Sequence, residues 1–203
     1  MKRLIFDLDN TLIKWDEEKN IKEISNLIKK HNLNITAEEV SNVIDLLDEK
    51  HDLISKQVLL EDLQERDSNI TMSFVKDIFK THNNFYEVNE DVIDTLKYLS
   101  RRYELVVLTN YFTKMQSIRM KKSKIYKYFN EVIGNDKVPG KPRKEAFDYA
   151  IKPYKKEECI MIGDNFDVDI KPALLYGINA IWLTDKETNF KSIKEIKELK
   201  SIL

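Results

Sequence analysis

The sequence predicts an α/β protein, in which an open parallel sheet has helices on both faces and an all-helical subdomain is inserted after the first strand. Three observations lead to this prediction. From residue 89 onward, apolar strand-like runs alternate with helical patterns. Residues 14–88 show helical periodicity and no strand-like run. Polar or acidic residues directly follow three of the predicted strands. We therefore expect a core of residues 1–13 and 89–203 and a helical insertion of residues 14–88.

The first predicted strand, Leu4–Phe6, ends in two carboxylates that are one residue apart. Successive side chains of a strand point to opposite sides, so Asp7 and Asp9 lie on the same side of an extended backbone. Two neighbouring negative charges near a buried strand end need a cation or a reacting group to compensate them. The same residues would also suit a strand that ends in an Asx turn at Asp9 and Asn10.

The insertion reads as a series of helices. Apolar residues recur at helical spacing in two stripes, the first formed by Ile21, Ile24, Leu27 and Ile28 and the second by Val40, Val43, Ile44 and Leu47. Thr36–Glu39 has the pattern of a capping box, which marks the start of the second stripe's helix. We predict two further helices over Ser55–Gln64 and Thr71–Thr81. A subdomain of this kind can also have a purely structural role.

The remainder of the chain alternates between helix and buried strand, which is typical of a parallel sheet. The predicted elements are a helix with Val92, Leu96 and Leu99 on its inner face, strand Glu104–Leu108, a helix from Thr113, strand Glu131–Ile133, helix Lys144–Ile151, strand Cys159–Ile162, helix Asp169–Tyr176, strand Asn179–Leu183 and a packing helix over Ser192–Leu199. In open sheets of this kind, ligands bind at the carboxyl ends of the strands.

Side chains that suit phosphate and metal occupy these strand ends. Thr109 and Asn110 follow one strand, and the acidic segment Gly163–Asp169 follows another. Lys141 adds a cation just before a helix. Carboxylates suit a hard cation, and hydroxyl, amide and ammonium groups suit an anion. The strand ends therefore predict a site that handles phosphate.

Composition excludes several other classes of protein. The formal charge is −1 with both signs interspersed, so no overall field favours nucleic acid. No segment approaches 18 consecutive apolar residues, and Met1–Arg3 leads into a strand without a signal-peptide pattern, so we expect a cytoplasmic protein with no membrane partner. The single cysteine, Cys159, is expected to be a buried thiol. Nothing in the composition indicates an oligomeric state.

The motifs together resemble those of the haloacid dehalogenase superfamily. The chain carries Asp7-x-Asp9-x-Thr11, a strand ending in Thr109-Asn110, then Lys141-Pro142 and Gly163-Asp164 followed by Asp169, in the order and at spacings compatible with that family. The likeness covers nearly the whole chain and is to the phosphatase-like branch, whose helical (C1-type) cap follows the first strand. It implies a Rossmann-like core.

The resemblance also implies roles for the residues that match its motifs. Asp7 would be the nucleophile that forms an aspartyl-phosphate, and Asp9 would protonate the leaving alcohol and then activate water, roles that agree with two adjacent carboxylates. Thr109, assisted by Asn110, would bind the phosphoryl oxygens. Lys141 would offset the charge of phosphate and nucleophile.

The same resemblance implies a Mg²⁺ ion as cofactor. Asp7, the backbone carbonyl of Asp9 and Asp164 would hold it. Asp169 would support this site directly, through water or by orienting Lys141. Asn165 stands where the family often has serine and would be a supporting residue.

Other side chains receive structural interpretations or open alternatives. Trp15 is a candidate substrate contact, although it could instead hinge or pack the insertion. The three histidines are expected at the surface, and the basic run is expected to be a solvated helix face rather than a polyanion site. These residues are His31, His51 and His82, and Arg119, Lys121, Lys122, Lys124 and Lys127.

We therefore expect a Mg²⁺-dependent phosphomonoesterase whose partner is a small phosphorylated metabolite, such as a sugar phosphate, a phosphoglycolate-like acid or a nucleoside monophosphate. Haloacid dehalogenation needs neither the second carboxylate nor a metal, so Asp9 and Gly163–Asp169 argue against it. A phosphomutase of the same superfamily shares every core residue and stays an alternative. A non-catalytic binding protein with this fold is the second alternative, although a binder gains nothing from clustered carboxylates.

Overall fold

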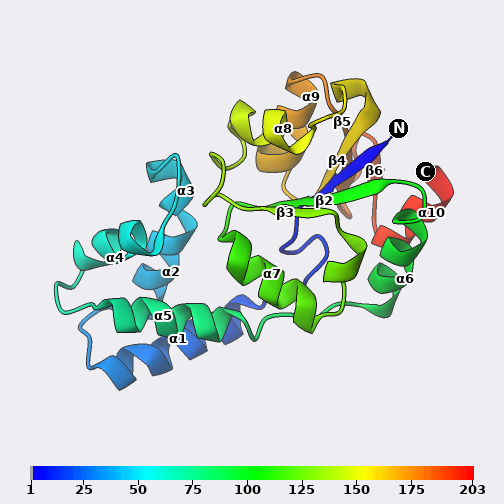
Figure 1. Cartoon of the computed structure of the whole chain (residues 1–203). Coiled ribbons are helices and arrows are strands. Elements are labelled where there is room, and N and C mark those ends of the chain that lie inside the picture. Colours follow the sequence, from blue (N-terminus) through cyan, green and yellow to red (C-terminus); the bar gives the residue numbers. More distant parts are fainter. Residues whose placement is uncertain (1) are drawn as a thin grey trace.

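A six-stranded parallel sheet forms the core of the computed structural model, which describes residues 2–203 (Figure 1). The strands lie in the order β3-β2-β1-β4-β5-β6. Their bounds are β1 Arg3–Phe6, β2 Glu104–Leu108, β3 Glu131–Ile133, β4 Cys159–Gly163, β5 Asn179–Leu183 and β6 Ser192–Ile193. The order reverses between β1 and β4, and a ligand crevice is expected at the carboxyl ends of strands at such a switch point.

The register of the central strands aligns their carboxyl ends. Phe6, the last residue of β1, pairs with Val107 of β2 and with Ile162 of β4. The residues that follow these positions in the three strands therefore emerge at the same edge of the sheet. The expected open parallel sheet is confirmed, and its carboxyl edge carries the polar residues that the sequence places there.

Alternation along the strands gives the sheet two apolar faces. Leu4 and Phe6 of β1 face one cluster, whereas Ile5 between them faces the other. The first cluster is covered by α6 (Glu90–Leu99), α7 (Thr113–Lys122) and α10 (Leu199–Ile202). The second is covered by α8 (Lys144–Ala150) and α9 (Lys171–Leu175). The short helical turns of the sheet domain are η1 Tyr126–Tyr128, η2 Lys156–Glu158, η3 Phe166–Ile170 and η4 Ile196–Glu198.

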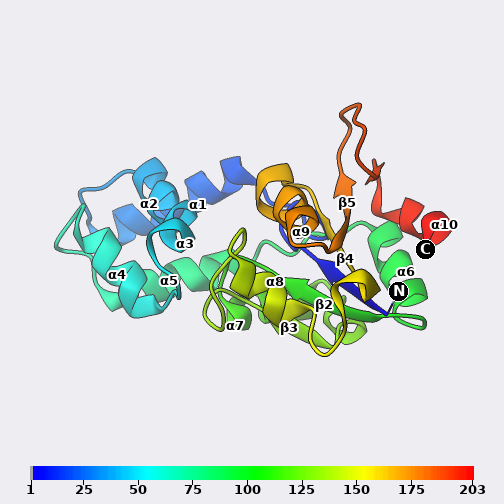
Figure 2. The same ribbon diagram turned by 90° about the horizontal axis from the view of Figure 1, so that it is seen from above.

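Five helices form a separate lobe beside the sheet, which we call the helical lobe (Figures 1 and 2). They are α1 Glu17–His31, α2 Ala37–Asp45, α3 Leu47–Lys50, α4 Lys56–Gln64 and α5 Met72–His82. The expected capping box is present, because Thr36 Oγ1 accepts from Glu39 N and Glu39 accepts from Thr36 N. Residues 14–88, all of which are described, contain no strand.

The helical lobe has its own apolar core, to which the sheet domain contributes Phe112 and Met115 near the start of α7. Two segments connect the lobe to the sheet, and they lie side by side, since Lys14 N donates to Glu87 O at 3.1 Å. The division of the chain at residues 13 and 89 into two domains stays a prediction, now with a separate apolar core on each side of it.

Two helix predictions are wrong in their bounds. Ser192–Ile193 does not begin a packing helix but forms the edge strand β6, paired with β5. The helical turn starts only at Ile196, because Glu198 accepts from the backbone N–H of Glu195 and thus caps the chain there. The helix expected from Asp169 begins earlier, as a π-helical turn at Phe166, because the Asn165 side chain accepts from the backbone N–H groups of Asp167 and Val168 and so caps the turn that follows it.

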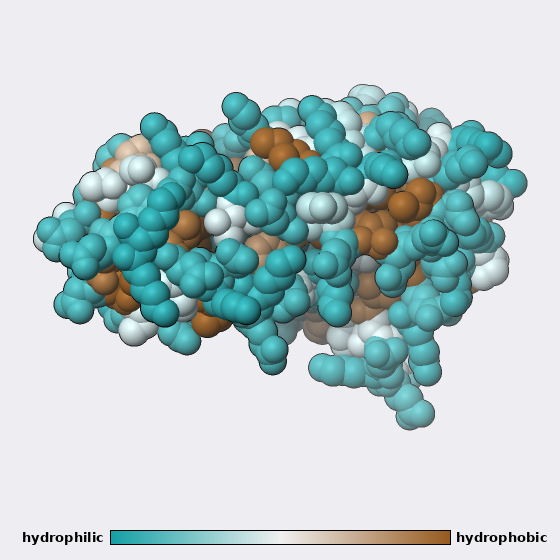
Figure 3. All heavy atoms as spheres, turned by 90° about the horizontal axis from the view of Figure 1, so that it is seen from below, coloured by the Kyte–Doolittle hydropathy of each residue, from teal (hydrophilic) through white to brown (hydrophobic). Residues whose placement is uncertain are grey.

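The face in Figure 3 is covered mainly by hydrophilic residues, with apolar atoms in small patches between them. Within residues 2–203, no helix has the length and apolar character needed to cross a lipid bilayer.

Candidate active site

The loop after β1 presents both carboxylates at the edge of the sheet. Asp7 N still donates to Ile162 O of β4, at 2.9 Å, so Asp7 is held as an extension of the strand. The chain then turns at Asn10, whose φ of 59° lies in the left-handed region that asparagine tolerates. Thr11 reaches back to the next strand end, where its hydroxyl donates to Asp164 Oδ1 at 2.9 Å.

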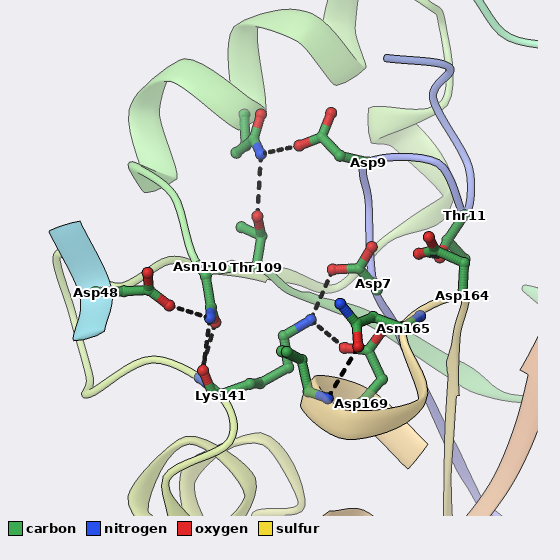
Figure 4. A network of polar contacts seen from close by, with 12 residues as sticks. Asp7, Asp9, Thr11, Asp48, Thr109, Asn110, Lys141, Asp164, Asn165 and Asp169 are labelled. Atoms are coloured by element: carbon green, nitrogen blue, oxygen red, sulfur yellow. Dashed lines mark hydrogen bonds and ion pairs between the residues drawn. The ribbon is translucent and has the colours of Figure 1, made fainter. Parts of the chain in front are cut away.

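Three carboxylates from two strand ends converge at this edge (Figure 4). Carboxylate oxygens of Asp7, Asp164 and Asp169 all lie within 4.8 Å of one another. Burial raises the pKa of Asp7 to about 7, and the pKa of Asp164 and that of Asp169 are also raised, mainly by burial. The protein around these three carboxylates therefore solvates their negative charge poorly.

Lys141 lies in the middle of this cluster. Its Nζ is 2.6 Å from Asp7 Oδ1 and 2.6 Å from Asp169 Oδ1, and its side chain is 2% exposed. Burial alone would lower the pKa of Lys141, but the charges of Asp169 and Asp7 outweigh it and hold the pKa above its usual range. The lysine is therefore a permanent cation beside Asp7.

Asn110 fixes the loop that carries this lysine. Its amide Nδ2 donates to Lys141 O at 2.6 Å, and its Oδ1 accepts from Lys141 N at 2.7 Å. The same Nδ2 also donates to the carboxylate of Asp48, in α3 of the helical lobe (Figure 4). Both amide atoms of Asn110 are thus engaged, and the residue joins the lobe to the strand ends.

Asp9 lies apart from the three-carboxylate cluster and contacts α7 instead. Arg119 Nη2 is 2.6 Å from Asp9 Oδ1, and Gln116 Nε2 donates to Asp9 Oδ2 at 2.8 Å. Arg119 is 1% exposed and also donates to Gln116 Oε1 at 2.7 Å. The two α7 side chains, one turn apart, thereby form a clamp on Asp9.

Thr109 completes the strand-end set from β2. Its backbone N–H donates to Ile133 O at 2.9 Å, so this group serves the sheet and is not free for an anion. Its hydroxyl oxygen accepts from Gln116 Nε2 at 3.0 Å, which leaves the hydroxyl hydrogen for a ligand. Any phosphate contact at Thr109 would therefore come through the side chain.

A glycine is required where β4 meets the cluster. A Cβ on Gly163 would lie 2.3 Å from Asp169 Oδ2, well inside contact distance. Asp169 Oδ2 is itself fixed, because Asn165 N donates to it at 3.2 Å. Asn165 also caps the following turn, where its Oδ1 accepts from Asp167 N and Val168 N. Asn165 and Asp169, the two predicted supporting residues, thus fix the conformation of the chain after β4.

The donor set suits a hard divalent cation. Asp7, Asp164 and Asp169 supply only carboxylate oxygens, which Mg²⁺ prefers, and their mutual crowding is what a cation would relieve. Both oxygens of Asp169 are engaged, by Lys141 Nζ and by Asn165 N, whereas Asp7 and Asp164 are each held through Oδ1, so Asp7 and Asp164 are the freer ligands. The Asp9 carboxylate is directed to α7, so any contribution of Asp9 would come from its backbone, as the sequence interpretation supposes.

The site opens into a cavity of about 400 Å³ between the sheet edge and the helical lobe. Trp15 lines it, but its ring is stacked on Phe85 at 4.8 Å and the Arg119 guanidinium lies 5.3 Å from its centroid. Its indole N–H donates to Glu17. Trp15 therefore packs the connection to the lobe as well as facing the cavity. A larger hollow of about 600 Å³, near Lys14 and Tyr86, is open and lacks the strand-end carboxylates.

The structure brings the predicted residues together and adds others. Four residues that contact the predicted ones had no role assigned from the sequence: Thr11, Asp48, Gln116 and Arg119. Arg119 was expected on a solvated face, and that expectation is wrong, although Lys121 and the later lysines of the run are exposed. The only signal in the sequence was the spacing of Gln116 and Arg119, which places both on one side of a helix.

His82 also departs from the expectation of a surface histidine. It is 1% exposed and lines the cavity, where Nδ1 is 3.0 Å from Tyr111 Oη and Nε2 is 3.1 Å from Asn20 Oδ1. His31 and His51 are partly exposed and contact Asp77 and Asp62. Burial of His82 follows from its place at the end of α5, which faces the sheet domain.

Comparison with known proteins gives one family and several relatives. A family model described as haloacid dehalogenase-like hydrolase matches residues 1–177. Pyrimidine 5'-nucleotidase PynA of Streptococcus pneumoniae is 27% identical over 199 residues, which cover 89% of this chain and 83% of PynA. Glyceraldehyde 3-phosphate phosphatase of Methanocaldococcus jannaschii is 27% identical over 224 residues, covering 100% of this chain and 97% of that protein.

A third relative is the HAD-hydrolase YfnB of Bacillus subtilis. The two sequences are 25% identical over 122 residues, and this match spans 58% of the present chain but only about half, 52%, of YfnB. The crystal structure of YfnB, described as bound to magnesium, superimposes with a TM-score of 0.76 at 20% identity and covers 100% of this chain and 98% of that one. At this identity the structural likeness concerns the fold alone.

Proposed function

This chain belongs to the haloacid dehalogenase-like hydrolase family, and from that membership we propose that it hydrolyses a small phosphate monoester through an aspartyl-phosphate on Asp7, with Mg²⁺ as cofactor. Relatives that are named as a nucleotidase and as a phosphatase support phosphate ester hydrolysis. One observation carries the proposal most directly: a buried lysine lies 2.6 Å from the carboxylate that would attack phosphorus.

Asp7 acts as the nucleophile in this proposal. Its Oδ1 is held by Lys141 Nζ, and Lys141 is in turn fixed by Asp169. Attack of the carboxylate on phosphorus forms the acyl phosphate and releases the alcohol, and a second displacement by water returns the free carboxylate. Dividing the reaction in this way replaces one difficult displacement by two easier ones.

Lys141 supplies charge rather than a proton. The pKa of Lys141 is held above its usual range by Asp169 and Asp7, so it stays cationic throughout. An anionic nucleophile and an anionic substrate repel each other, and a fixed cation between them reduces that repulsion. The Thr109 hydroxyl is placed to bind a phosphoryl oxygen at the neighbouring strand end.

Asp9 is the acid and base. It lies two residues beyond the nucleophile and lines the same cavity. Arg119 and Gln116 are positioning residues, since each holds one of its carboxylate oxygens. A proton donor that is held in one orientation can protonate the leaving alcohol and then accept a proton from the attacking water.

The carboxylates of Asp7 and Asp164, with support from Asp169, would hold the Mg²⁺ ion. When bound, the ion neutralises phosphate charge and so lets the carboxylate approach. Thr11 fixes Asp164 for this role through its hydroxyl. One alternative is a phosphomutase, which would use the same core residues. The other is a non-catalytic binding protein, which would keep the fold and catalyse no reaction.

The test is phosphate release from a panel of phosphorylated metabolites, with Mg²⁺ and with chelator, for the wild type and for Asp7→Asn. We expect release that requires both the ion and Asp7. Release that persists in Asp7→Asn would contradict the nucleophile. A folded wild type that releases no phosphate but isomerises a sugar phosphate would support the phosphomutase instead.

A further inference from the structure

The wall that the helical lobe contributes to the cavity carries negative charge. Its charged lining residues are Asp45, Asp48 and Glu49, all from the end of α2 and from α3. Among the described residues that line the cavity, the cations are Arg119 and Lys141. Both come from the sheet domain, and both already contact carboxylates. A leaving group in this cavity therefore meets three carboxylates from the lobe and no cation that could pair with a second anion.

Asp48 brings this charge close to the reacting phosphate. Its carboxylate accepts from Asn110 Nδ2, and Asn110 holds the backbone of the Lys141 loop. Arg143 from the sheet domain donates to the backbone oxygens of Asp48 and Glu49. This arrangement fixes α3 against the strand ends. Within this cavity, Asp48 is therefore held next to the loop that carries Lys141.

A second part of the wall is buried, polar and uncharged. Asn20, Ser41 and His82, with 3%, 6% and 1% exposure, line the cavity together with Tyr111. Burial, followed by the charge of Arg119, lowers the pKa of His82 to about 3, so the ring is neutral at pH 7. Buried polar groups at a cavity wall that carry no charge suit a ligand that forms hydrogen bonds without carrying charge.

The direction of the hydrogen bonds along this wall follows from the Asn20 amide. Asn20 Oδ1 can only accept, so His82 Nε2 carries the hydrogen and His82 Nδ1 accepts from the Tyr111 hydroxyl. At the other end, Asn20 Nδ2 donates to Ser41 Oγ at 3.0 Å. Within residues 2–203, the Ser41 hydroxyl has no acceptor of its own. The Ser41 O–H and the second hydrogen of Asn20 Nδ2 are therefore donors of this wall that are not used in these bonds, and the phenolic oxygen of Tyr111 is an acceptor.

We propose that this wall selects phosphate esters of uncharged, hydroxyl-bearing alcohols and rejects esters whose leaving group carries a carboxylate. The inference rests on the proposed phosphatase function and narrows its substrate class. Ser41 O–H and Tyr111 Oη bind hydroxyl groups of the leaving alcohol, and Asp48, with Asp45 and Glu49, repels a second anion. Sugar phosphates and related polyol phosphates fit this description, and phosphoglycolate-like acids do not.

The experiment uses substrate pairs that differ only in the group at issue. The first pair is 2-hydroxyethyl phosphate and phosphoglycolate, and the second is glycerol 3-phosphate and 3-phosphoglycerate. Each is assayed by phosphate release with Mg²⁺ at pH 7.5, beside p-nitrophenyl phosphate, which carries no second anion. We expect kcat/KM for the uncharged member of each pair to exceed that of the acid by about tenfold or more, since unit charges several ångströms apart interact by a few kcal/mol near a protein surface.

Variants of the wall residues test whether the wall causes this substrate preference. Asp45→Asn/Asp48→Asn keeps an oxygen that can accept from Asn110 and removes two charges, so we expect the preference within each pair to fall by about tenfold. Ser41→Ala should raise KM for the hydroxyl-bearing substrates, relative to KM for p-nitrophenyl phosphate, by about fivefold, the value of one hydrogen bond. The matched controls are Glu38→Gln, on the exposed side of α2, and Ser25→Ala, whose hydroxyl donates within α1. Neither control should change the preference.

The outcomes separate this inference from the proposed function. If neither the pairs nor p-nitrophenyl phosphate is hydrolysed in an Asp7-dependent way, both the function and the inference fail. If p-nitrophenyl phosphate is hydrolysed but the acid of each pair is the equal or better substrate, or neither alcohol ester is hydrolysed, the inference alone is overturned. A preference that the double variant leaves unchanged also overturns it.

Discussion

Arg119 Nη2 lies 2.6 Å from Asp9 Oδ1, and the arginine is 1% exposed whereas Asp9 is 33% exposed. The two partners therefore differ in what they lose when the pair is broken. A carboxylate that is one-third exposed can turn to water, but the buried guanidinium would keep only neutral partners, namely Gln116 Oε1, Phe85 O and the Trp15 ring. Arg119 thus depends on Asp9 for stability, and Asp9 depends on Arg119 for its orientation.

Removal of Asp9 should reduce stability as well as turnover. In Asp9→Ala the buried Arg119 loses its counter-charge, so we expect the free energy of unfolding to fall by about 3 kcal/mol, as when one partner of a buried ion pair is removed. Urea unfolding and phosphate release measure the two effects. Activity near the wild-type level would contradict the acid and base role.

Replacing the arginine should separate the same two effects. Arg119→Met leaves Asp9 free to solvate, so stability should fall less, while kcat should drop about tenfold or more, as for loss of a residue that orients a functional ligand. Asp9→Ala/Arg119→Met should recover most of the stability lost in Asp9→Ala and none of the activity. Lys114→Met, on the exposed side of α7, is the control. A double variant as unstable as Asp9→Ala would refute the pairing argument.

Asp7→Asn should abolish turnover and stabilise the metal-free protein at neutral pH. Burial raises the pKa of Asp7 from 3.8 to about 7, so ionising this carboxylate disfavours the folded state. This cost is absent below about pH 4, grows as the pH rises, and is complete above about pH 7. In chelator, the variant should therefore gain stability relative to the wild type across this range. Denaturant unfolding at several pH values measures it, and a difference that shrinks with rising pH would contradict the sign.

Gly163→Ala should damage the site without removing any charged group. The added Cβ would lie 2.3 Å from Asp169 Oδ2, and Asp169 is 1% exposed and cannot move aside. We expect a loss of about 1 to 3 kcal/mol from overpacking, together with a fall in kcat, because Asp169 holds Lys141. Asp169→Ala should cause a similar fall in kcat. Wild-type kinetics in Gly163→Ala would show that the carboxylate tolerates displacement.

The helical lobe should lose stability in acid through Asp77. This carboxylate of α5 accepts from Lys30 at 2.7 Å, Lys80 at 2.8 Å and His31 at 3.0 Å, and these bonds hold the pKa of Asp77 well below its ordinary value of 3.8. Its stabilising effect is therefore present above about pH 4 and is lost as the pH falls through the lower folded value.

The corresponding comparison is between the wild type and Asp77→Asn. The variant should be less stable at pH 7, and the difference should diminish as the pH falls below about 4. Asp94→Asn, an exposed position of α6, is the control and should show no such dependence. A stability difference between wild type and Asp77→Asn that grows toward low pH would contradict the prediction.

Much of the fold could be predicted because its signals are local. An apolar run such as Glu104–Leu108 indicates a strand covered on both faces, and a stripe such as Val40–Leu47 indicates the inner side of a helix. The tail was mispredicted at Ser192–Ile193. These two residues form an edge strand by pairing with β5, and so short a segment has no strand pattern of its own. Ile193 of this segment contributes to the apolar cluster on one face of the sheet.

The polar residues at the ends of β1, β2 and β4 could likewise be predicted, since parallel strands with their side chains alternating must bring Asp7, Thr109 and Asp164 to one edge. The contacts that residues outside these strand ends make with them could not be predicted. Arg119 resembles the exposed lysines around it in sequence, and its burial follows from the side on which α7 packs. Asp48 and His82 meet the sheet domain only because the helical lobe docks over the strand ends. Side-chain alternation along a strand is a property of the local sequence, whereas the docking of a lobe is a balance of many distant contacts. The sequence by itself therefore determined which polar groups lie at the ends of the strands, and only the tertiary structure decided which other groups surround the cavity there.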